Sequence, residues 1–164
     1  MRRIKVVSEP TDLVPILRAF DSDVKRNVFR RLVDGWLTPS AVEKEFGPEG
    51  AEALRFFEKT KLVETRWEPA QPGMPPEKGF HSYYTSVQVN TQCMVQDLAE
   101  LFAVAAMNSE AFERIEADLD GMVTEEGASQ RAVLEKFGWP QVRLKAILKR
   151  STKFEMRGQL VRRI

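Results

Sequence analysis

The sequence predicts a mainly α-helical fold with small β-hairpins, of the winged helix-turn-helix type. Two short helices, at residues 39–46 and 49–60, are separated by a Gly-Pro pair that turns the chain. Two strand-like runs, at residues 62–68 and 80–89, then flank a loop rich in proline. Two helices, a tight turn and a hairpin in this order indicate a helix-turn-helix followed by a wing.

The first short helix carries clear start and stop signals. Thr38 can cap its N-terminus, and Pro39 suits the first helical position because its missing N–H would be unpaired there. Val42 and Phe46 lie on one apolar face at helical spacing. Gly47 then ends the helix, so we expect the turn at this point.

The second short helix has one apolar side and one charged side. The apolar side can pack on the core, with the Lys61 stem along its edge, and it consists of Ala51, Leu54, Phe57 and Lys61. The charged side can face a groove or solvent, and it consists of Glu52, Arg55 and Lys59.

The predicted wing begins with residues 62–68, which alternate apolar and polar side chains as a half-buried strand does. Its loop holds Pro69, Pro72, Gly73, Pro75, Pro76 and Gly79. Prolines can neither donate to a sheet nor continue a helix, so this stretch is a loop. The run at 80–89 supplies the second strand.

Length and composition limit the class of protein. The chain has 164 residues, 43% of them apolar, which is enough for one sizeable core or two small ones. No apolar run approaches the roughly 18 residues that span a bilayer, and the N-terminus reads as a short strand rather than a signal peptide. Cys93 is the only cysteine, so we expect neither a disulfide nor a zinc site, and a cytoplasmic protein without cofactors.

Charge is distributed unevenly although the net charge is only +1. Residues 94–127 hold nine acids against Arg114, a balance of −8. Residues 143–164 hold eight bases against Glu155, a balance of +7. Such segregation predicts opposite fields on different parts of the surface, although solvated helix faces also explain it.

Further helices are predicted where apolar residues recur every three or four positions, at residues 11–20, 24–33, 93–107 and 110–119. The first two would complete the core under the winged unit. The expected organisation is an N-terminal winged helix-turn-helix over 1–91, a helical dimerisation or connecting segment over 92–122, and a second helix-turn-helix-like unit over 123–164.

The C-terminal segment resembles the first winged unit when the chain is shifted by 91 residues. Six identities in 26 positions result, among them Phe46-Gly47 on Phe137-Gly138. Leu54 falls on Lys145, so the second helix must rotate or slip by one residue. A small second wing could turn at Arg157-Gly158. The alternative is a helical hairpin finished by a strand.

The residues at 41–47, 54–64 and 79–85 together resemble the ArsR-type winged-helix transcriptional regulators, most closely their archaeal branch. Membership would imply a homodimer that binds an operator in double-stranded DNA. The helix after the wing would supply the dimer contact through Met94, Leu98, Leu101, Phe102 and Ala105. Metal-sensing members carry paired cysteines or clustered histidines and acids, whereas this chain has Cys93 and His81 alone.

Cationic side chains would provide the DNA affinity by neutralising phosphates. Arg55 could fork onto a guanine, and Glu52 could accept from a cytosine amino group. In the first unit the expected DNA-contacting residues are Glu52, Arg55, Lys59, Lys61, Arg66, Lys78 and His81. In the second unit they are Arg143, Lys145, Lys149 and Arg150, which form a more basic helix.

Each of these assignments has an alternative. Arg55 and Lys59 could lie on an ordinary solvated face, His81 could hydrogen-bond at a sheet surface, and Cys93 could be a redox sensor or a buried structural cysteine. The three tryptophans are expected to be packing residues. No glycine-rich phosphate loop, serine elbow or histidine–acid cluster indicates an enzyme. The rival function is a winged-helix protein-interaction module in a larger assembly, which Glu49 and Glu52 favour.

Overall fold

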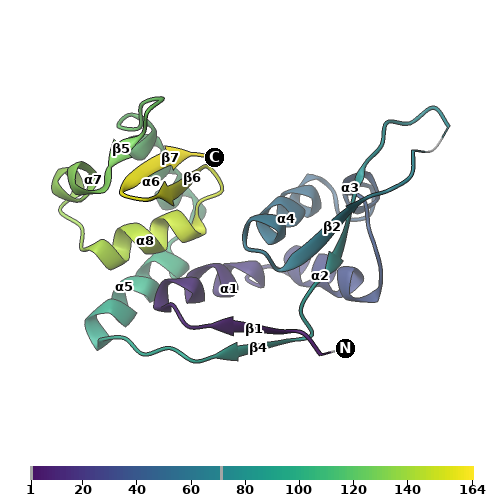
Figure 1. The fold of residues 1–164 in the computed structure, drawn as a ribbon, viewed down its shortest axis with the longest axis horizontal. Helices are drawn as coiled ribbons and strands as arrows, with labels where there is room; N and C mark the ends of the chain where they lie inside the picture. The colour runs from purple at the N-terminus through teal and green to yellow at the C-terminus, as the bar shows by residue number, and fades with distance from the viewer. Residues whose placement is uncertain (1, 71) are drawn as a thin grey trace. The chain divides into compact units, whose positions relative to one another are not determined.

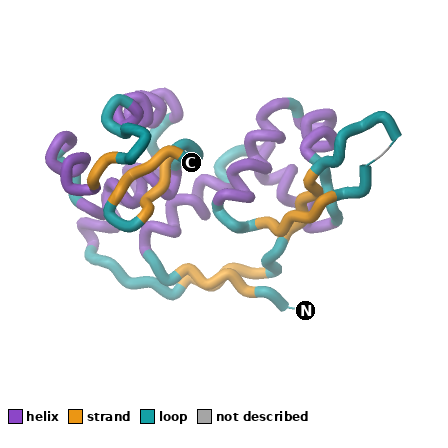
Figure 2. Tube along the Cα trace, turned by 45° about the horizontal axis from the view of Figure 1, so that its top comes forward, coloured by secondary structure: helices purple, strands orange, loops and turns teal. Residues whose placement is uncertain are grey.

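The computed structural model describes residues 2–70 and 72–164 and divides the chain into two compact units. The first unit holds the chain up to Val6 together with Ala19–Val89, and the second holds Val7–Arg18 together with Asn90–Ile164. Each unit combines short helices with small sheets of two or three strands (Figures 1 and 2). The predicted fold class, mainly helical with winged units, is confirmed.

The first unit is a three-helix core with a hairpin. Its helices and hairpin strands are α2 (Asp23–Asp34), α3 (Pro39–Phe46), α4 (Pro48–Lys59), β2 (Val63–Trp67) and β3 (Lys78–Ser82). Two further strands, β1 (Ile4–Val7) and β4 (Ser86–Val89), pair with each other in a separate two-stranded sheet. The last residue of β1 already belongs to the second unit.

The helix signals of the first unit act as the sequence predicts. Thr38 Oγ1 accepts a hydrogen bond from the Ala41 amide at 3.3 Å, and Pro39 occupies the first turn of α3. Gly47 ends α3 with φ at +73°, in the left-handed region where a side chain would be strained. The helix-turn-helix geometry therefore depends on this glycine.

Aromatic side chains fill the core of the first unit. Phe57 of α4 is fully buried and meets the ring of Phe29 edge-on at 5.3 Å, while Phe29 meets Phe20 in the same way at 5.1 Å. Leu32 and Leu54 complete the packing between α2 and α4. Burying side chains of this size contributes roughly 1.5–3 kcal/mol each, which fixes α4 with its charged side outward.

The wing is shorter than predicted. β2 and β3 pair antiparallel from Val63↔Ser82 to Trp67↔Lys78, and β3 ends at Ser82 instead of continuing to residue 89. Ser82 Oγ donates to the Tyr84 carbonyl at 3.1 Å, and the Thr85 amide donates to the Arg3 carbonyl at 2.9 Å. The chain thus turns away from the hairpin, and residues 86–89 pair with β1.

In the described residues, the second unit contains a 3-10 turn, five α-helices and one three-stranded sheet. Its elements are η1 (Pro10–Asp12), α1 (Leu13–Ala19), α5 (Val95–Ala106), α6 (Ser109–Asp120), β5 (Ala128–Ser129), α7 (Gln130–Phe137), α8 (Gln141–Arg150), β6 (Phe154–Arg157) and β7 (Leu160–Arg163). The strands lie in the order β5-β7-β6. α1 ends at Ala19 and so carries the chain into the first unit.

The internal repeat is confirmed at the positions that define a winged helix. Ser129 lies 91 residues after Thr38 and caps α7 in the same way, accepting from the Ala132 amide at 3.1 Å. Gly138 lies 91 residues after Gly47 and also has a positive φ, of +65°. Both glycines therefore end the first helix of their unit at a positive φ, although the chain then continues differently, with ψ at −171° at Gly47 and +29° at Gly138.

A short β-paired segment precedes each helix-turn-helix, and the two segments are again 91 residues apart. Leu37 forms an isolated bridge with Phe80, and Ala128, 91 residues later, pairs with Val161. β6 and β7 form a second hairpin that turns at Gly158, whose φ is +61°. The alternative of a helical hairpin finished by one strand is therefore wrong.

Two expected boundaries differ from those in the structure. The helix predicted at residues 11–20 was expected under the first winged unit, but Val14 is buried in the core of the second. The expected connecting segment at 92–122 is not separate, because Leu101 of α5 and Phe112 of α6 lie in that same core. Apolar side chains on these helices are covered by the C-terminal unit.

We predict that Gly50→Ala destabilises the first unit. A Cβ at residue 50 would lie 2.7 Å from Phe46 Cβ and 2.9 Å from Val42 Cγ1, where α3 and α4 approach most closely. Overpacking of this kind costs roughly 1–3 kcal/mol, more than the gain of up to about 1 kcal/mol in helix propensity. Urea unfolding should show the loss. Gly35→Ala, whose Cβ meets nothing within 4 Å, is the matched control. Equal stability of the two variants would contradict the close approach.

Candidate nucleic-acid interface

The exposed side of α4 is set by burial of its other side. Ala53, Leu54 and Phe57 are buried, so Glu52 and Arg55 face solvent. Arg55 forms no ion pair with any residue in the described part of the chain, and its guanidinium is available to an external acceptor. A free, exposed arginine on the second helix of a helix-turn-helix has the position of a base-reading side chain.

The neighbours of Arg55 are less accessible than the sequence predicts. Lys59 is half-buried in the last turn of α4. Lys61 lies beyond the helix, because α4 ends at Lys59, and it is exposed in the left-handed conformation with φ at +55°. Lys61 therefore follows the recognition helix at its junction with β2 rather than lying along the apolar side of the helix.

The wing cations are paired with half-buried carboxylates. Arg66 Nε lies 2.7 Å from Glu68 Oε1, and Lys78 Nζ lies 2.6 Å from Glu58 Oε1. Partly exposed pairs of this kind contribute only about 0–1 kcal/mol, so a phosphate can replace the carboxylate at small cost. Arg66 also lies over the ring of Trp36, 4.0 Å from its centroid, which fixes the direction of the side chain.

His81 supports the hairpin from its outer face. Its Nδ1 lies 3.1 Å from Glu64 Oε1, and its ring stacks on Trp36 at 5.2 Å. Arg3 Nη1 donates to the same Glu64 oxygen at 3.2 Å. These contacts fit the alternative in which His81 hydrogen-bonds at a sheet surface, and they leave it half-buried.

Trp67 departs from its expected packing role. Its side chain is 69% exposed at the end of β2, opposite Lys78, where the hairpin extends past the core. The register places Trp67 on the same face as the buried Phe80, yet its side chain stays exposed. Sequence reasoning missed this exposed aromatic, and the adjacent proline-rich loop was the signal that the core had ended.

Two basic side chains of α8 form ion pairs within their own unit. Arg143 Nη1 lies 3.2 Å from Glu100 Oε2 of α5, and Lys149 Nζ lies 2.7 Å from Asp12 Oδ1 of η1. Both cations were expected to contact phosphates. Both pairs join α8 to another element of its own unit, and the Lys149 pair is partly exposed, as the wing pairs are.

Arg150 is a correction to the predicted interface. It is only 5% exposed and donates from Nη1 to the carbonyls of Val104 and Met107, both at 2.7 Å. Its guanidinium lies 4.1 Å from the centroid of the Phe112 ring. The last carbonyls of a helix lack intrahelical partners and carry partial negative charge, so Arg150 serves as the C-terminal cap of α5.

Comparing positions 91 residues apart shows how α8 differs from α4. Ala146 takes the place of Arg55 after the shift of 91 residues, and it is fully buried. Arg150 takes the place of Lys59 and is buried as well. Lys145 alone among the four predicted contacts of α8 is exposed without an ion pair to a described residue. Relative to α4, α8 is therefore rotated as the mismatch of Leu54 with Lys145 indicates. The positions that correspond to the exposed Arg55 and to Lys59 are buried in α8.

Some acids of residues 94–127 pair with bases of the C-terminal segment. Arg163 Nε lies 2.7 Å from Asp120 Oδ1, and Lys153 Nζ lies 2.9 Å from Glu116 Oε2. The hydrogen bond from Arg163 lowers the pKa of Asp120 below its usual value. The hydrogen bond to Glu116, followed by its negative charge, raises the pKa of Lys153. α6 thus serves as the counterion surface of the C-terminal strands.

The five residues predicted to form a dimer contact divide into two groups. Leu101 and Ala105 are buried in the core of their own unit, so they are unavailable to a partner. Met94 and Phe102 are exposed, and Leu98 is half-buried. Val95, which the sequence analysis did not single out, is 82% exposed. α5 therefore presents a second apolar face that its own unit does not cover.

Other chemistries find little support in the described residues. Across residues 2–70 and 72–164, no three histidine, cysteine, aspartate or glutamate side chains converge as a metal site would require. Cys93 is half-buried just before α5. No helix in the part of the chain that the structure describes has the length and apolar character of a bilayer span.

Two tandem winged helix-turn-helix units, one with an open recognition helix, define the class of winged-helix regulators. A family model described as "ArsR transcriptional regulator" matches residues 7–164. The chain therefore belongs to the ArsR family of transcriptional regulators, which is not a family of enzymes. The match extends through both units, beyond the first winged unit that the sequence resemblance covered. None of the curated proteins compared with the chain matches it.

We predict that Arg150→Met destabilises the second unit by roughly 2–4 kcal/mol, because two carbonyls at the end of α5 lose their donor. Chemical unfolding followed by circular dichroism measures the loss. Arg157→Met removes an exposed arginine paired only with Glu155 and should change stability by less than about 0.5 kcal/mol. Equal effects of the two substitutions would show that Arg150 has no capping role.

Proposed function

We propose that this ArsR-family regulator binds duplex DNA as a homodimer, through α4 and the β2–β3 hairpin of its first unit. The observation that carries the proposal is the contrast between the two helix-turn-helix units. Arg55 is exposed and unpaired among the described residues, while its counterpart Ala146 is buried. We therefore assign the major-groove contact to the second helix of the first unit.

Each part of the first unit would have its own task. Arg55 would contact base edges, with Glu52 beside it as an acceptor for a cytosine amino group. Arg66, Lys78 and Lys61 would exchange their solvent or carboxylate partners for phosphates along the backbone. The wing strand at 79–85 is the part that resembles the archaeal branch, and a regulator of this kind would act on chromosomal DNA in the cytoplasm.

Acidic residues shape this interface as well. Glu49 and Glu52 lie exposed at the start of α4, where they reduce nonspecific attraction to phosphates. The same two residues support the second candidate function, a protein-interaction module that does not bind DNA. A gel shift on random duplex at low salt separates the two, because a DNA-binding regulator shows at least weak nonspecific binding and a pure interaction module shows none.

We predict that Arg55→Ala lowers the affinity for operator DNA by about 1–3 kcal/mol and relaxes base preference at one position. Fluorescence anisotropy on duplexes selected from genomic fragments measures both effects. Arg131→Ala, at an exposed arginine of α7 in the second unit, is the matched control and should leave affinity and its salt dependence unchanged. The proposed interface fails if the two variants behave alike.

The dimer is proposed from the uncovered face of α5. Val95 is 82% and Phe102 is 53% exposed, and Ala99, Ala103 and Ala106 continue the same apolar surface along the helix. Apolar side chains at this spacing on an exposed helix indicate a contact with a second helix. Two copies of α5 would bury each other's faces about a two-fold axis.

We predict that Phe102→Glu converts the dimer to a monomer, because two carboxylates would be buried without partners at the axis. Sedimentation equilibrium measures the mass. Val33→Glu introduces the same charge at an exposed valine of α2 and should leave the oligomeric state unchanged. A wild-type chain that sediments as a monomer at micromolar concentration would refute the dimer directly.

A further inference from the structure

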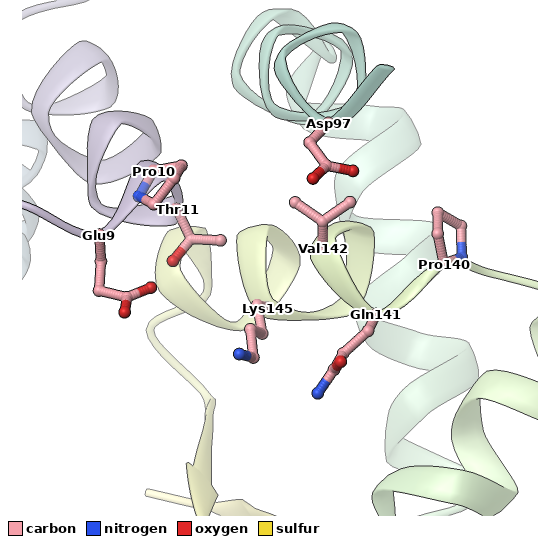
Figure 3. A pocket seen from close by; sticks show the side chains of 8 residues that line it. All are labelled: Glu9, Pro10, Thr11, Asp97, Pro140, Gln141, Val142 and Lys145. Atoms are coloured by element: carbon pink, nitrogen blue, oxygen red, sulfur yellow. The ribbon is translucent and has the colours of Figure 1, made fainter. Parts of the chain in front are cut away.

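A hollow with a volume of about 340 Å³ lies within the second unit and is lined by three separate segments (Figure 3). Glu9, Pro10 and Thr11 come from η1 and the residue before it, and Asp97 comes from the first turn of α5. Pro140, Gln141, Val142 and Lys145 line it from the start of α8. Its volume falls within the range of small-molecule sites, roughly 300–1,000 Å³.

Three charged side chains of this hollow form no ion pair within the described protein. They are Glu9, Asp97 and Lys145. The other basic residues of α8 behave differently, since Arg143 pairs with Glu100 and Lys149 with Asp12. Lys145 lines the same hollow as the Glu9 and Asp97 carboxylates and forms an ion pair with neither. A ligand with groups of both charges could therefore bind between the ammonium and the carboxylates.

The walls favour a ligand with an apolar middle. Pro10, Pro140 and Val142 contribute hydrocarbon surface, and Gln141 adds an amide that can donate and accept. Figure 3 shows the Asp97 carboxylate reaching from α5 toward Val142, while Gln141 and Lys145 extend from α8 on the other side of Val142. Pro140 provides no side-chain cap to α8, so the amides of Gln141 and Val142 favour an anionic group at the start of that helix.

We propose that this hollow binds a small basic amino acid, a ligand with two cationic groups, one carboxylate and an aliphatic chain. Its cationic groups would pair with Glu9 and Asp97, and its carboxylate would pair with Lys145. The class of ligand follows from the charges that line the hollow. Two carboxylates and one ammonium complement a ligand of net charge +1. A simple diamine leaves Lys145 without a partner, and a neutral amino acid leaves one carboxylate unpaired.

The ligand would act as the effector of the proposed regulator, and this step rests on the proposed function. It bridges η1, α5 and α8, three elements that also meet through the pairs of Arg143 and Lys149 and through Arg150 beneath α5. η1 leads directly into α1 and from there into the first unit, and α5 bears the proposed dimer face. A ligand that binds only the assembled form of these elements stabilises that form by mass action.

Isothermal titration calorimetry on the full chain without DNA tests the site. The probes are L-lysine, L-ornithine and L-arginine, compared with cadaverine, which lacks the carboxylate, and L-norleucine, which lacks the second cation. At least one basic amino acid should bind with a Kd below about 1 mM and at least roughly tenfold more tightly than cadaverine and norleucine. Absence of binding by all three up to about 10 mM would overturn the proposal.

Two substitutions in the hollow and two matched controls locate the binding. Asp97→Asn and Lys145→Met should each weaken the best ligand at least roughly tenfold, and Lys145→Met should also abolish its advantage over cadaverine. Glu125→Gln and Lys136→Met remove exposed charges of the same types elsewhere in the second unit and should leave the affinity unchanged. Equal binding by all four variants would place the ligand outside the hollow and overturn the assignment.

The effector role has a separate measurement. The ligand found by calorimetry should change the operator affinity of the wild-type chain at least roughly threefold and have no effect on Lys145→Met. A ligand that binds in the hollow without changing operator affinity would overturn the effector role. A chain that binds no DNA with or without ligand refutes the proposed function instead, and the calorimetric result for the hollow stands independently of it.

Discussion

The insertion of Arg150 beneath the C-terminal end of α5 is the interaction on which the rest of this account depends. The guanidinium is 5% exposed and hydrogen-bonds the carbonyls of Val104 and Met107. A buried cation is tolerated only where its donors are satisfied, and these carbonyls at a helix end provide both acceptors and partial negative charge. Because Arg150 binds these carbonyls, α5 packs against α8. The α8 positions that correspond to Arg55 and Lys59 of α4 are then buried.

This constraint gives the two repeats different roles. The first unit keeps an exposed recognition helix with an available arginine, and the second uses the same backbone plan to hold α5. α5 is apolar on both sides, with Leu101 and Val104 packed into the core and Val95 and Phe102 facing outward. The covered helix-turn-helix would thereby support the dimer face that we propose on α5.

Local signals made much of the fold predictable from the sequence. Thr38 and Ser129 cap their helices, Gly47 and Gly138 make the turns, and the 91-residue shift places both pairs in register. These features depend on residues close in the chain, so the pattern of residue types was sufficient. The end of the wing at Ser82 was not predictable in this way, because the pairing of residues 86–89 with β1 depends on contacts between distant segments.

The candidate site was predictable only in part, for the same physical reason. Arg55 was correctly placed on an exposed face, since the apolar side of α4 is evident from its spacing. Arg143, Lys149 and Arg150 look equally suitable in sequence, but their partners Glu100, Asp12 and the carbonyls of α5 lie 43 or more residues away. A count of basic residues along a helix cannot distinguish residues that could contact phosphate from residues that pair inside the protein. That distinction depends on partners far away in the chain, which the sequence pattern does not show.

Amide hydrogen exchange of the full chain, free and bound to its operator, tests the central claim most directly. The account predicts that DNA slows exchange in α4 and in the β2–β3 hairpin, while the amides of α8 and of the β6–β7 hairpin exchange at unchanged rates. New protection in α8 with none in α4 would contradict it, since the second unit would then be the one that meets the double helix.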